Sequence, residues 1–467
     1  MNRFSRSAMR AWAGAGSRFL PFADAATPDL PLSRLLRLSL FQVSVGMALV
    51  LLVGTLNRVM IVELAVPASL VGVMIALPLV FAPFRALIGF RSDSHQSALG
   101  WRRVPFIYRG AMLQFGGLAI MPFALLVLSG QGDAAHAPAW VGMAAAALAF
   151  LLVGIGMHTI QTVGLALATD LAPVEARPKV VGLMYVMLLF GMIASALAFG
   201  WLLSDYNNGK LVQVIQAAAV LTIVLNGIAI WKQEPRNTTR RDATVAATTA
   251  PRFRDAWEQF ARGDRAVLHL VIVALGTMAF SMQDVLLEPY GGQILRLAVP
   301  DTTKLTATLA AGGLAGFGLA SRLLGRGFDP LRLALIGAAL GVPAFLAVIL
   351  AQPFGSIALF ALGTASIGFA AGLFGHGTLT ATMNRAPAGE AGLSLGAWGA
   401  AQASAAGLAI ALGGIIRDVL AGRGATPASA YHSVYAIEIV LLMLTLLLAT
   451  PMLRGGAVVK SRALASQ

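Results

Sequence analysis

Long apolar runs separated by short polar turns make up almost the whole chain. The runs are roughly 20 residues or longer, enough for an α-helix to cross the ~30 Å hydrocarbon core of a bilayer. The pattern predicts twelve helices, near residues 36–62, 67–89, 104–129, 138–169, 178–203, 211–231, 267–289, 303–321, 331–351, 355–384, 391–416 and 432–452. This is the pattern of an all-α membrane protein.

A polar stretch at 232–265 divides the predicted helices into two sets of six. Within it Phe253, Trp257 and Phe260 give one face of a short helix an aromatic character, which suits a helix lying on the membrane surface or packed beneath the two halves. The predicted segments are an N-terminal segment 1–33, a first half 34–231, the linker 232–265, a second half 266–453 and a tail 454–467.

Composition agrees with a membrane protein. Hydrophobic residues make up 58% of the 467 residues, charged residues only 12%, and the mean hydropathy is +0.78. A soluble protein carries about 25% charged residues. The chain contains no cysteine, which excludes disulfides, iron–sulfur clusters and thiol chemistry.

Lysine and arginine mark the expected orientation. Membrane proteins concentrate these residues in their cytosolic loops, so the net charge of +14 indicates topology rather than nucleic-acid binding. With both termini cytosolic, nearly all of them fall in cytosolic segments. The opposite loops hold only Lys210, Arg296, Lys304, Arg417 and Arg423.

Charge gathers in the turn between the second and third predicted helices. Gly89-x-x-x-Asp93 is followed there by the basic pair Arg102 and Arg103. The arrangement resembles the signature loop of the major facilitator superfamily, with an insertion at 94–99 between the acid and the basic pair. The resemblance implies a cytosolic latch in which the carboxylate pairs with helix ends and basic groups. A solvated loop that only sets orientation is the alternative.

The two halves show weak internal similarity. "TDLAPVEARPKVVGLMY" can be laid over "MNRAPAGEAGLSLGAWG" at an offset of 214, which places Asp170 opposite Asn384. Helix 1 "LNRVMIVE" likewise echoes helix 7 "MQDVLLE". Two pseudo-symmetric six-helix halves, joined by a cytosolic linker and with both termini cytosolic, are therefore the expected architecture.

Four charged residues lie inside the predicted first and seventh helices. A charge at mid-membrane costs about 2.5–3.5 kcal/mol on insertion scales, so such residues need partners. The repeat places Arg58 opposite Asp284, and we expect the two to approach each other or to bracket a polar cavity. For Glu63 and Glu288 a position at the outer interface is the favoured interpretation.

Two histidines lie well inside apolar helices, each four residues after a glycine: Gly154 before His158, and Gly372 before His376. Helical side chains lean toward the preceding turn, so each imidazole would lie over a residue without a side chain. That geometry would leave room for a flat macrocycle with the imidazole as axial ligand. A hydrogen bond within the bundle is the favoured alternative for either histidine alone.

Several stretches resemble a specific family within the superfamily: "RFLPFADAATPDLPLSRLLRLSLFQVSVGM", "GTLNRVMIVEL", "APFRALIGFRSD", "SALGWRRVP" and "QFGGLAIMPFALLVLSG". They are similar to the PucC/LhaA, or bacteriochlorophyll-delivery, family of purple phototrophic bacteria. One departure is "FIYRG", where Tyr108 and Arg109 stand at positions expected to be aromatic or apolar.

The resemblance implies a non-enzymatic assembly factor for light-harvesting antenna complexes in the intracytoplasmic photosynthetic part of the bacterial inner membrane. It implies transient bacteriochlorophyll binding, antenna polypeptides as clients, and contacts with pigment-synthesis or protein-insertion machinery. A proton-coupled transporter of a small or tetrapyrrole-like solute, using Arg58, Asp284 and Glu288, is the alternative. A structural subunit of the mature photosynthetic complex is a third possibility and predicts stoichiometric presence there.

Overall fold

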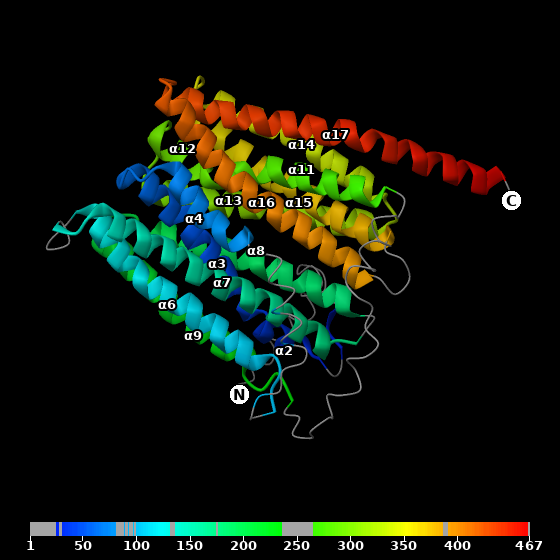
Figure 1. The fold of residues 1–467 in the computed structure, drawn as a ribbon. Helices are drawn as coiled ribbons and strands as arrows, with labels where there is room; N and C mark the ends of the chain where they lie inside the picture. Colours follow the sequence, from blue (N-terminus) through cyan, green and yellow to red (C-terminus); the bar gives the residue numbers. More distant parts are fainter. Residues whose placement is uncertain are drawn as a thin grey trace, which may run out of the picture. The chain divides into compact units, whose positions relative to one another are not determined.

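The computed structural model describes residues 25–27, 30–80, 88, 92, 97, 100–130, 136–173, 176–235, 265–385 and 391–465. Every long element in this part of the chain is a helix (Figure 1). Eleven helices are long and apolar enough to cross a membrane, and the shorter apolar helix α4 (Ala68–Val80) makes twelve. The predicted all-α fold is confirmed with eleven candidate spans and the shorter α4 among the described residues, and the protein is a multi-pass membrane protein. The cytosolic placement of both termini stays a prediction.

Packing divides the chain into two compact units. The first comprises Met1–Leu51 and Phe84–Thr238, and the second comprises Leu52–Pro83 and Thr239–Gln467. The part of helix 1 from Leu52 onward and all of α4 thus pack with the C-terminal helices. The predicted segment boundaries stay predictions. In the structure, residues 52–83 belong to the same unit as the C-terminal helices.

The first unit is built from long helices that approach closely through glycine. Its elements are α2 (Leu32–Leu38), α3 (Leu40–Leu49), α6 (Val104–Ser129), α7 (Ala139–Leu171), α8 (Arg177–Leu202) and α9 (Asn208–Ile230). Helices α6 and α7 lie side by side in Figure 1. At their contact a Cβ on Gly156 would lie 2.5 Å from the backbone nitrogen of Gln114, so only glycine fits.

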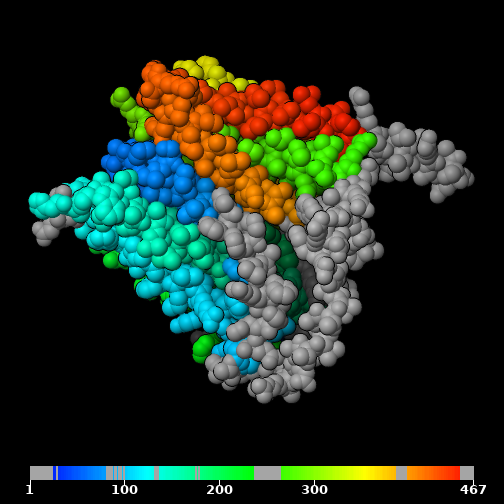
Figure 2. Space-filling model, in the orientation of Figure 1, coloured from blue at the N-terminus to red at the C-terminus, as the bar shows by residue number. Residues whose placement is uncertain are grey.

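The second unit contains α4 and the remaining helices. They are α11 (Ala266–Ser281), α12 (Leu287–Gln293), α13 (Val299–Gly325), α14 (Pro330–Ala351), α15 (Ile357–Arg385), α16 (Ala391–Gly422) and α17 (Pro427–Ala465). Figure 2 shows α4, in blue, beside α16, in orange, and Gly72 of α4 packs on the backbone of Ile410. Helix α17 continues through the predicted tail.

Helices 1 and 7 depart from α geometry at matching places. Helix 1, which runs from α2 through α3, contains the π-helical segments η2 (Val50–Leu56) and η3 (Val59–Glu63). Helix 7, which runs from α11 to α12, breaks between them at the 3₁₀ turn η6 (Met282–Val285). These are the two stretches that the repeat sets against each other. Irregular helical geometry within a membrane helix commonly marks a functional position.

Candidate functional site

The basic pair of the predicted signature loop holds the end of α7. Arg102 Nη2 lies 3.2 Å from Asp170 Oδ2, and Arg103 Nε lies 3.1 Å from the same oxygen. Arg103 Nη1 also donates to Ser92 Oγ at 2.5 Å. Gly89 and Asp93 lie outside the described residues, so the acidic half of the loop remains a prediction.

Glu234, which the sequence placed in the linker, caps the start of α6. Its carboxylate oxygens accept from the backbone nitrogens of Arg102 at 2.8 Å, Arg103 at 3.0 Å and Val104 at 2.9 Å. These are the N–H groups that a helix start leaves without partners, and a negative charge there is stabilised by the helix dipole. The segment after α9 is thereby fixed to the start of α6.

Gln233 ties the same segment to helix α2. Arg34 Nε donates to Gln233 Oε1 at 3.0 Å, and Arg34 Nη2 donates to the carbonyl of Gln233 at 2.9 Å. The Gln233 amide returns a hydrogen bond to the Arg34 carbonyl at 3.3 Å. Residues 233 and 234 therefore connect three helices of the first unit at one end.

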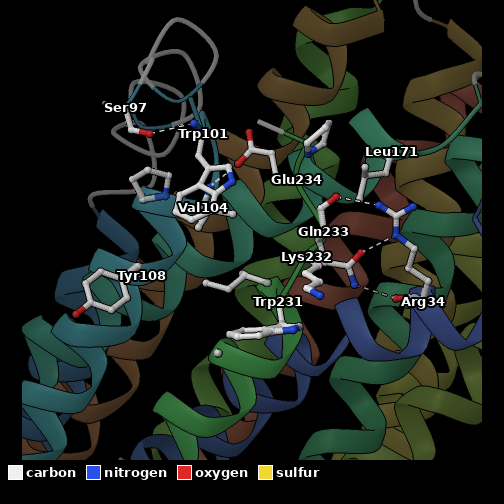
Figure 3. A pocket seen from close by; sticks show the side chains of 14 residues that line it. Arg34, Ser97, Trp101, Val104, Tyr108, Leu171, Trp231, Lys232, Gln233 and Glu234 are labelled. Carbon is white, nitrogen blue, oxygen red and sulfur yellow. Dashed lines mark hydrogen bonds between the residues drawn. The ribbon is translucent and has the colours of Figure 1, made fainter. Parts of the chain in front are cut away.

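A cavity of about 1180 Å³ opens beside these contacts, within the first unit (Figure 3). Its lining comes from α2, the residues before α6, the ends of α6, α7 and α9, and the residues that follow α9: Arg34, Ser97, Trp101, Val104, Pro105, Tyr108, Leu171, Gly227, Ile230, Trp231, Lys232, Gln233, Glu234 and Pro235. Typical small-molecule pockets enclose about 300–1,000 Å³, so this one is large enough for a bulky ligand.

Three aromatic side chains form much of the apolar wall of the cavity. Trp101, Tyr108 and Trp231 surround the open space in Figure 3. Tyr108 is 56% exposed and Trp231 is 65% exposed, although both have large apolar rings. Tyr108 belongs to "FIYRG", the stretch that departed from the expected pattern, and the structure makes it part of the cavity wall. Polar groups lie at one side, where Gln233 and Glu234 are already hydrogen-bonded.

The second unit holds the charges predicted inside the membrane. Arg58 is 4% exposed, forms an ion pair with Glu63 and donates through Nη2 to the carbonyl of Leu297 at 3.1 Å. The ion pair of Arg58 is thus with Glu63 and not with Asp284, while the alternative that Arg58 and Asp284 bracket a polar cavity stays a prediction. The neighbouring Asn57 makes the contact between helices 1 and 7, donating to the Val285 carbonyl at 3.0 Å.

Glu288 is buried rather than interfacial. It is 4% exposed, and its Oε1 accepts a hydrogen bond from the Thr306 hydroxyl of α13. A Cβ on Gly54 would lie 2.7 Å from Glu288 Oε1, so the glycine of helix 1 leaves the space that this carboxyl occupies. The interfacial interpretation fails for Glu288 and stays a prediction for Glu63, whose side chain is 39% exposed.

Glu438 is a buried acid that sequence reasoning passed over. It is fully buried on α17, and its Oε1 accepts from the backbone nitrogen of Gln283 at 2.6 Å, at the break in helix 7. The Gln283 side-chain amide donates to Asp284 Oδ1. Two carboxyl groups thus meet on either side of one glutamine. The signal was a lone glutamate in the apolar run "YAIEIVLL".

Arg417 was assigned to a loop, but it lies within α16. It donates to Asp418 Oδ1 and to Gln293 Oε1, each at 2.8 Å, and its guanidinium lies 5.1 Å from the centre of the Tyr431 ring. Asp418 Oδ2 accepts from the backbone nitrogen of Ser69 at 2.7 Å, at the start of α4. The loop count that supported the orientation loses this arginine.

The two predicted pigment ligands differ in what surrounds them. A Cβ on Gly372 would lie 2.7 Å from the carbonyl oxygen of Gly313, and the His376 ring centre lies 4.2 Å from that of Phe317. Helix α13 thus occupies the space predicted for a macrocycle over Gly372, which corrects that geometry. His158 lies half-buried on α7, with Gly154 buried beneath it, and stays a prediction.

Comparison with known proteins identifies the family. The PUCC protein family matches residues 55–457. The chain belongs to this family. It is 60% identical to Protein PucC of Cereibacter sphaeroides over 94% of this chain and 96% of that protein. It is 28% identical to a Rhodobacter capsulatus protein named bacteriochlorophyll synthase 44.5 kDa chain, over 91% and 96%.

Solved structures of bacterial transporters share the fold of this chain. A point mutant of the nucleoside transporter NupG superimposes with a TM-score of 0.67 at 14% identity, covering 90% of this chain and 99% of the transporter. A bacterial homologue of the iron transporter ferroportin, in its inward-facing state, gives a TM-score of 0.65 at 14% identity, covering 89% and 98%. Identity this low shows a shared fold and no more.

Proposed function

We propose that this protein is an assembly factor for bacterial light-harvesting antenna complexes, which holds bacteriochlorophyll and antenna polypeptides in the membrane until they are joined. The cavity of about 1180 Å³ with its aromatic wall carries the proposal, because it suits a bulky, flat, largely apolar cargo. The names of the relatives favour the same cargo, since one is called a chain of bacteriochlorophyll synthase.

The expected setting follows from that role. The protein would act in the intracytoplasmic photosynthetic membrane, with antenna polypeptides as clients and pigment-synthesis or insertion machinery as neighbours. Exposed apolar side chains such as Phe190, Leu197 and Trp201 on α8 offer a membrane-facing surface for single-span polypeptides. Arg34 and Glu234 at the cavity are already hydrogen-bonded within the protein, and the aromatic wall favours such a cargo over a sugar or an amino acid.

The test is an absorption spectrum of the tagged protein, purified gently from photosynthetic membranes. We expect bacteriochlorophyll to copurify with the wild type and to fall several-fold in the cavity variant Trp101→Ala/Tyr108→Ala. Trp140→Ala is the matched control, because Trp140 is 65% exposed in the same unit and does not line the cavity. His158→Ala and His376→Ala test the two predicted ligands beside them.

Each outcome separates one alternative. If the cavity variant retained the pigment, pigment delivery would remain the proposed function, but the cavity would not be the binding site. Antenna polypeptides that copurify without pigment would make the protein a chaperone of polypeptides only. Stoichiometric presence in mature complexes would indicate a structural subunit.

A proton-coupled transporter is the second candidate function. The carboxyls of Asp284 and Glu288 within helix 7 favour it, because ionisable residues inside membrane helices commonly mark transport pathways. Proteoliposomes with an imposed pH gradient provide the direct test. Gradient-driven uptake of a soluble tetrapyrrole, abolished in Glu288→Gln, would support transport over assembly.

A further inference from the structure

The acids and bases inside the second unit do not balance. The arginines that pack near the break in helix 7 are each committed to another acid: Arg58 pairs with Glu63 and Arg417 pairs with Asp418. Asp284, Glu288 and Glu438 remain, and none of them has a cation within ion-pair distance among the described residues. Three carboxyls, buried at Glu288 and Glu438 and half-buried at Asp284, therefore lie in the bundle without an ion pair of their own among the described residues.

Their hydrogen bonds are also incomplete. Each carboxyl is held on one side by its own donor: Asp284 by the Gln283 amide, Glu288 by the Thr306 hydroxyl, and Glu438 by the Gln283 backbone nitrogen. The second oxygens of Glu288 and Glu438 are buried without a partner in the described structure. The Asn57 and Gln283 side-chain oxygens beside them are likewise buried acceptors without donors.

A buried acceptor without a donor costs about 1–3 kcal/mol, and a buried carboxylate without a counter-charge costs far more. A proton on the free carboxyl oxygen removes both costs at once, because it cancels the charge and supplies an O–H donor for a neighbouring oxygen. We propose that Asp284, Glu288 and Glu438 form a proton-binding site around the break in helix 7. This inference does not depend on the proposed function.

The geometry favours protons over a metal ion. The three carboxyls are bonded to separate donors rather than converging on one point, and a calcium-type site needs six to eight oxygens around one ion. Among the described residues no three acidic or histidine side chains gather closely enough to hold a metal.

The other titratable groups on the neighbouring helices are engaged elsewhere. The Tyr290 hydroxyl of α12 lies 3.1 Å from His432 Nε2 of α17, and the Tyr431 hydroxyl donates to Gln293. His269 of α11 is bonded to Thr382, and Lys304 of α13 pairs with Asp301. Arg322 of α13 and Arg332 of α14 are exposed. Tyr435, one turn before Glu438 on α17, has a buried hydroxyl without a partner and is the remaining donor available to this site.

The position of the site gives the proton a mechanical effect. Glu438 of α17 binds the backbone of Gln283 where helix 7 is broken, while Asp284 is bonded to the side chain of the same glutamine. Loss of the proton would place two negative charges on either side of one residue. The repulsion would loosen η6 from α17, so proton release and the shape of helix 7 are coupled.

Infrared difference spectroscopy of the purified protein in lipid nanodiscs tests the site directly. At neutral pH solvent-exposed acids are ionised, so a C=O band of protonated carboxylic acid that shifts in D₂O reports buried protonated groups. We expect this band in the wild type, a partial loss in Asp284→Asn, Glu288→Gln or Glu438→Gln, and its disappearance in the triple variant. Asp205→Asn and Asp301→Asn are matched controls, since these exposed acids are paired with lysine, and should leave the band unchanged.

Three results would overturn the proposal. The first is the absence of the band from the wild type at neutral pH. The second is a band that survives in the triple variant and disappears in a control. The third is a band that sodium ions abolish at constant pH, which would make this a metal-cation site. If the triple variant does not fold, the reversible loss of the wild-type band at alkaline pH supports the site, and a band that persists there overturns it.

Discussion

The two units differ in the kind of polar side chain that they bury. The interior of the first unit holds a neutral network, in which the Gln114 amide donates to Ser44 and Thr222, and Asn226 donates to Ser44. Its ion pairs and its carboxylate cap lie at the helix ends, at Asp170 and Glu234. The second unit instead buries Arg58, Glu288 and Glu438, and holds Asp284, Arg417 and Asp418 half-buried beside them.

This difference separates a fixed part from a responsive part. A neutral network keeps the same hydrogen bonds at every pH, so it specifies one packing of its helices. A network of ionisable groups changes its charge with protons and can occupy more than one state. The cargo cavity lies in the unit with the neutral interior, and the expected proton site lies in the other.

Arg58→Met should produce the largest loss of stability. It removes the buried donor to the Leu297 carbonyl and leaves Glu63 without its partner. A buried acceptor that loses its donor costs about 1–3 kcal/mol. Thermal unfolding in detergent, followed by tryptophan fluorescence, measures it. Lys304→Ala is the control and should cost under about 1 kcal/mol, because its pair with Asp301 is exposed on both sides. Equal costs for the two variants would contradict the assignment of Arg58 as the buried anchor.

Gln114→Leu tests the neutral interior of the first unit. It removes donors to the Ser44 and Thr222 oxygens, with an expected cost of about 1–2 kcal/mol. The cost should be the same at pH 6 and pH 9, since no group in that network ionises. A cost that changed with pH would break the contrast between the units.

Glu438→Gln is the counterpart in the second unit. If folding retains a proton on Glu438 that the unfolded chain releases, the native state binds more protons and wild-type stability falls as pH rises. The glutamine variant should be less sensitive to pH between 6 and 9. Thermal unfolding of both proteins across this range measures the difference in slope. An unchanged slope would place the pH response outside this carboxyl.

The sequence predicted the helices well and the contacts poorly, for physical reasons. An apolar run long enough to cross the bilayer is a local property of the sequence. The positions of spans such as Val104–Ser129 and Pro330–Ala351 could therefore be predicted from the sequence. The contact of Glu234 with the start of α6 joins residues 130 positions apart, and that of Glu438 with Gln283 joins residues 155 apart. No periodicity encodes such a pairing. Arg417 beside Asp418 was assigned to a loop because a charged pair at the end of an apolar run is typical of a membrane interface.

Glu234→Ala tests the carboxylate cap at the end of the first unit. The variant leaves the first backbone N–H groups of α6 without their acceptor, and loss of a helix cap costs about 1 kcal/mol. Hydrogen exchange at Arg102, Arg103 and Val104 should become faster, while exchange in the middle of α6 stays slow. The cost should shrink in high salt, because the carboxylate acts partly through its charge. Unchanged exchange at these three amides would remove Glu234 as the cap.

Arg102→Ala and Arg103→Ala should give the smallest effects and sharpen the comparison within one ion pair. Both arginines contact Asp170 Oδ2, but the Arg102 side chain is 47% exposed and the Arg103 side chain only 6%. An exposed pair contributes about 0.2–1 kcal/mol, so Arg102→Ala should cost about 0.5 kcal/mol or less and become negligible in high salt. Arg103→Ala should cost more, because it also removes the bond to Ser92. Thermal unfolding of the two variants at low and high salt measures the two costs. A larger cost for Arg102→Ala would mean that the exposed arginine, and not the buried one, holds the end of α7.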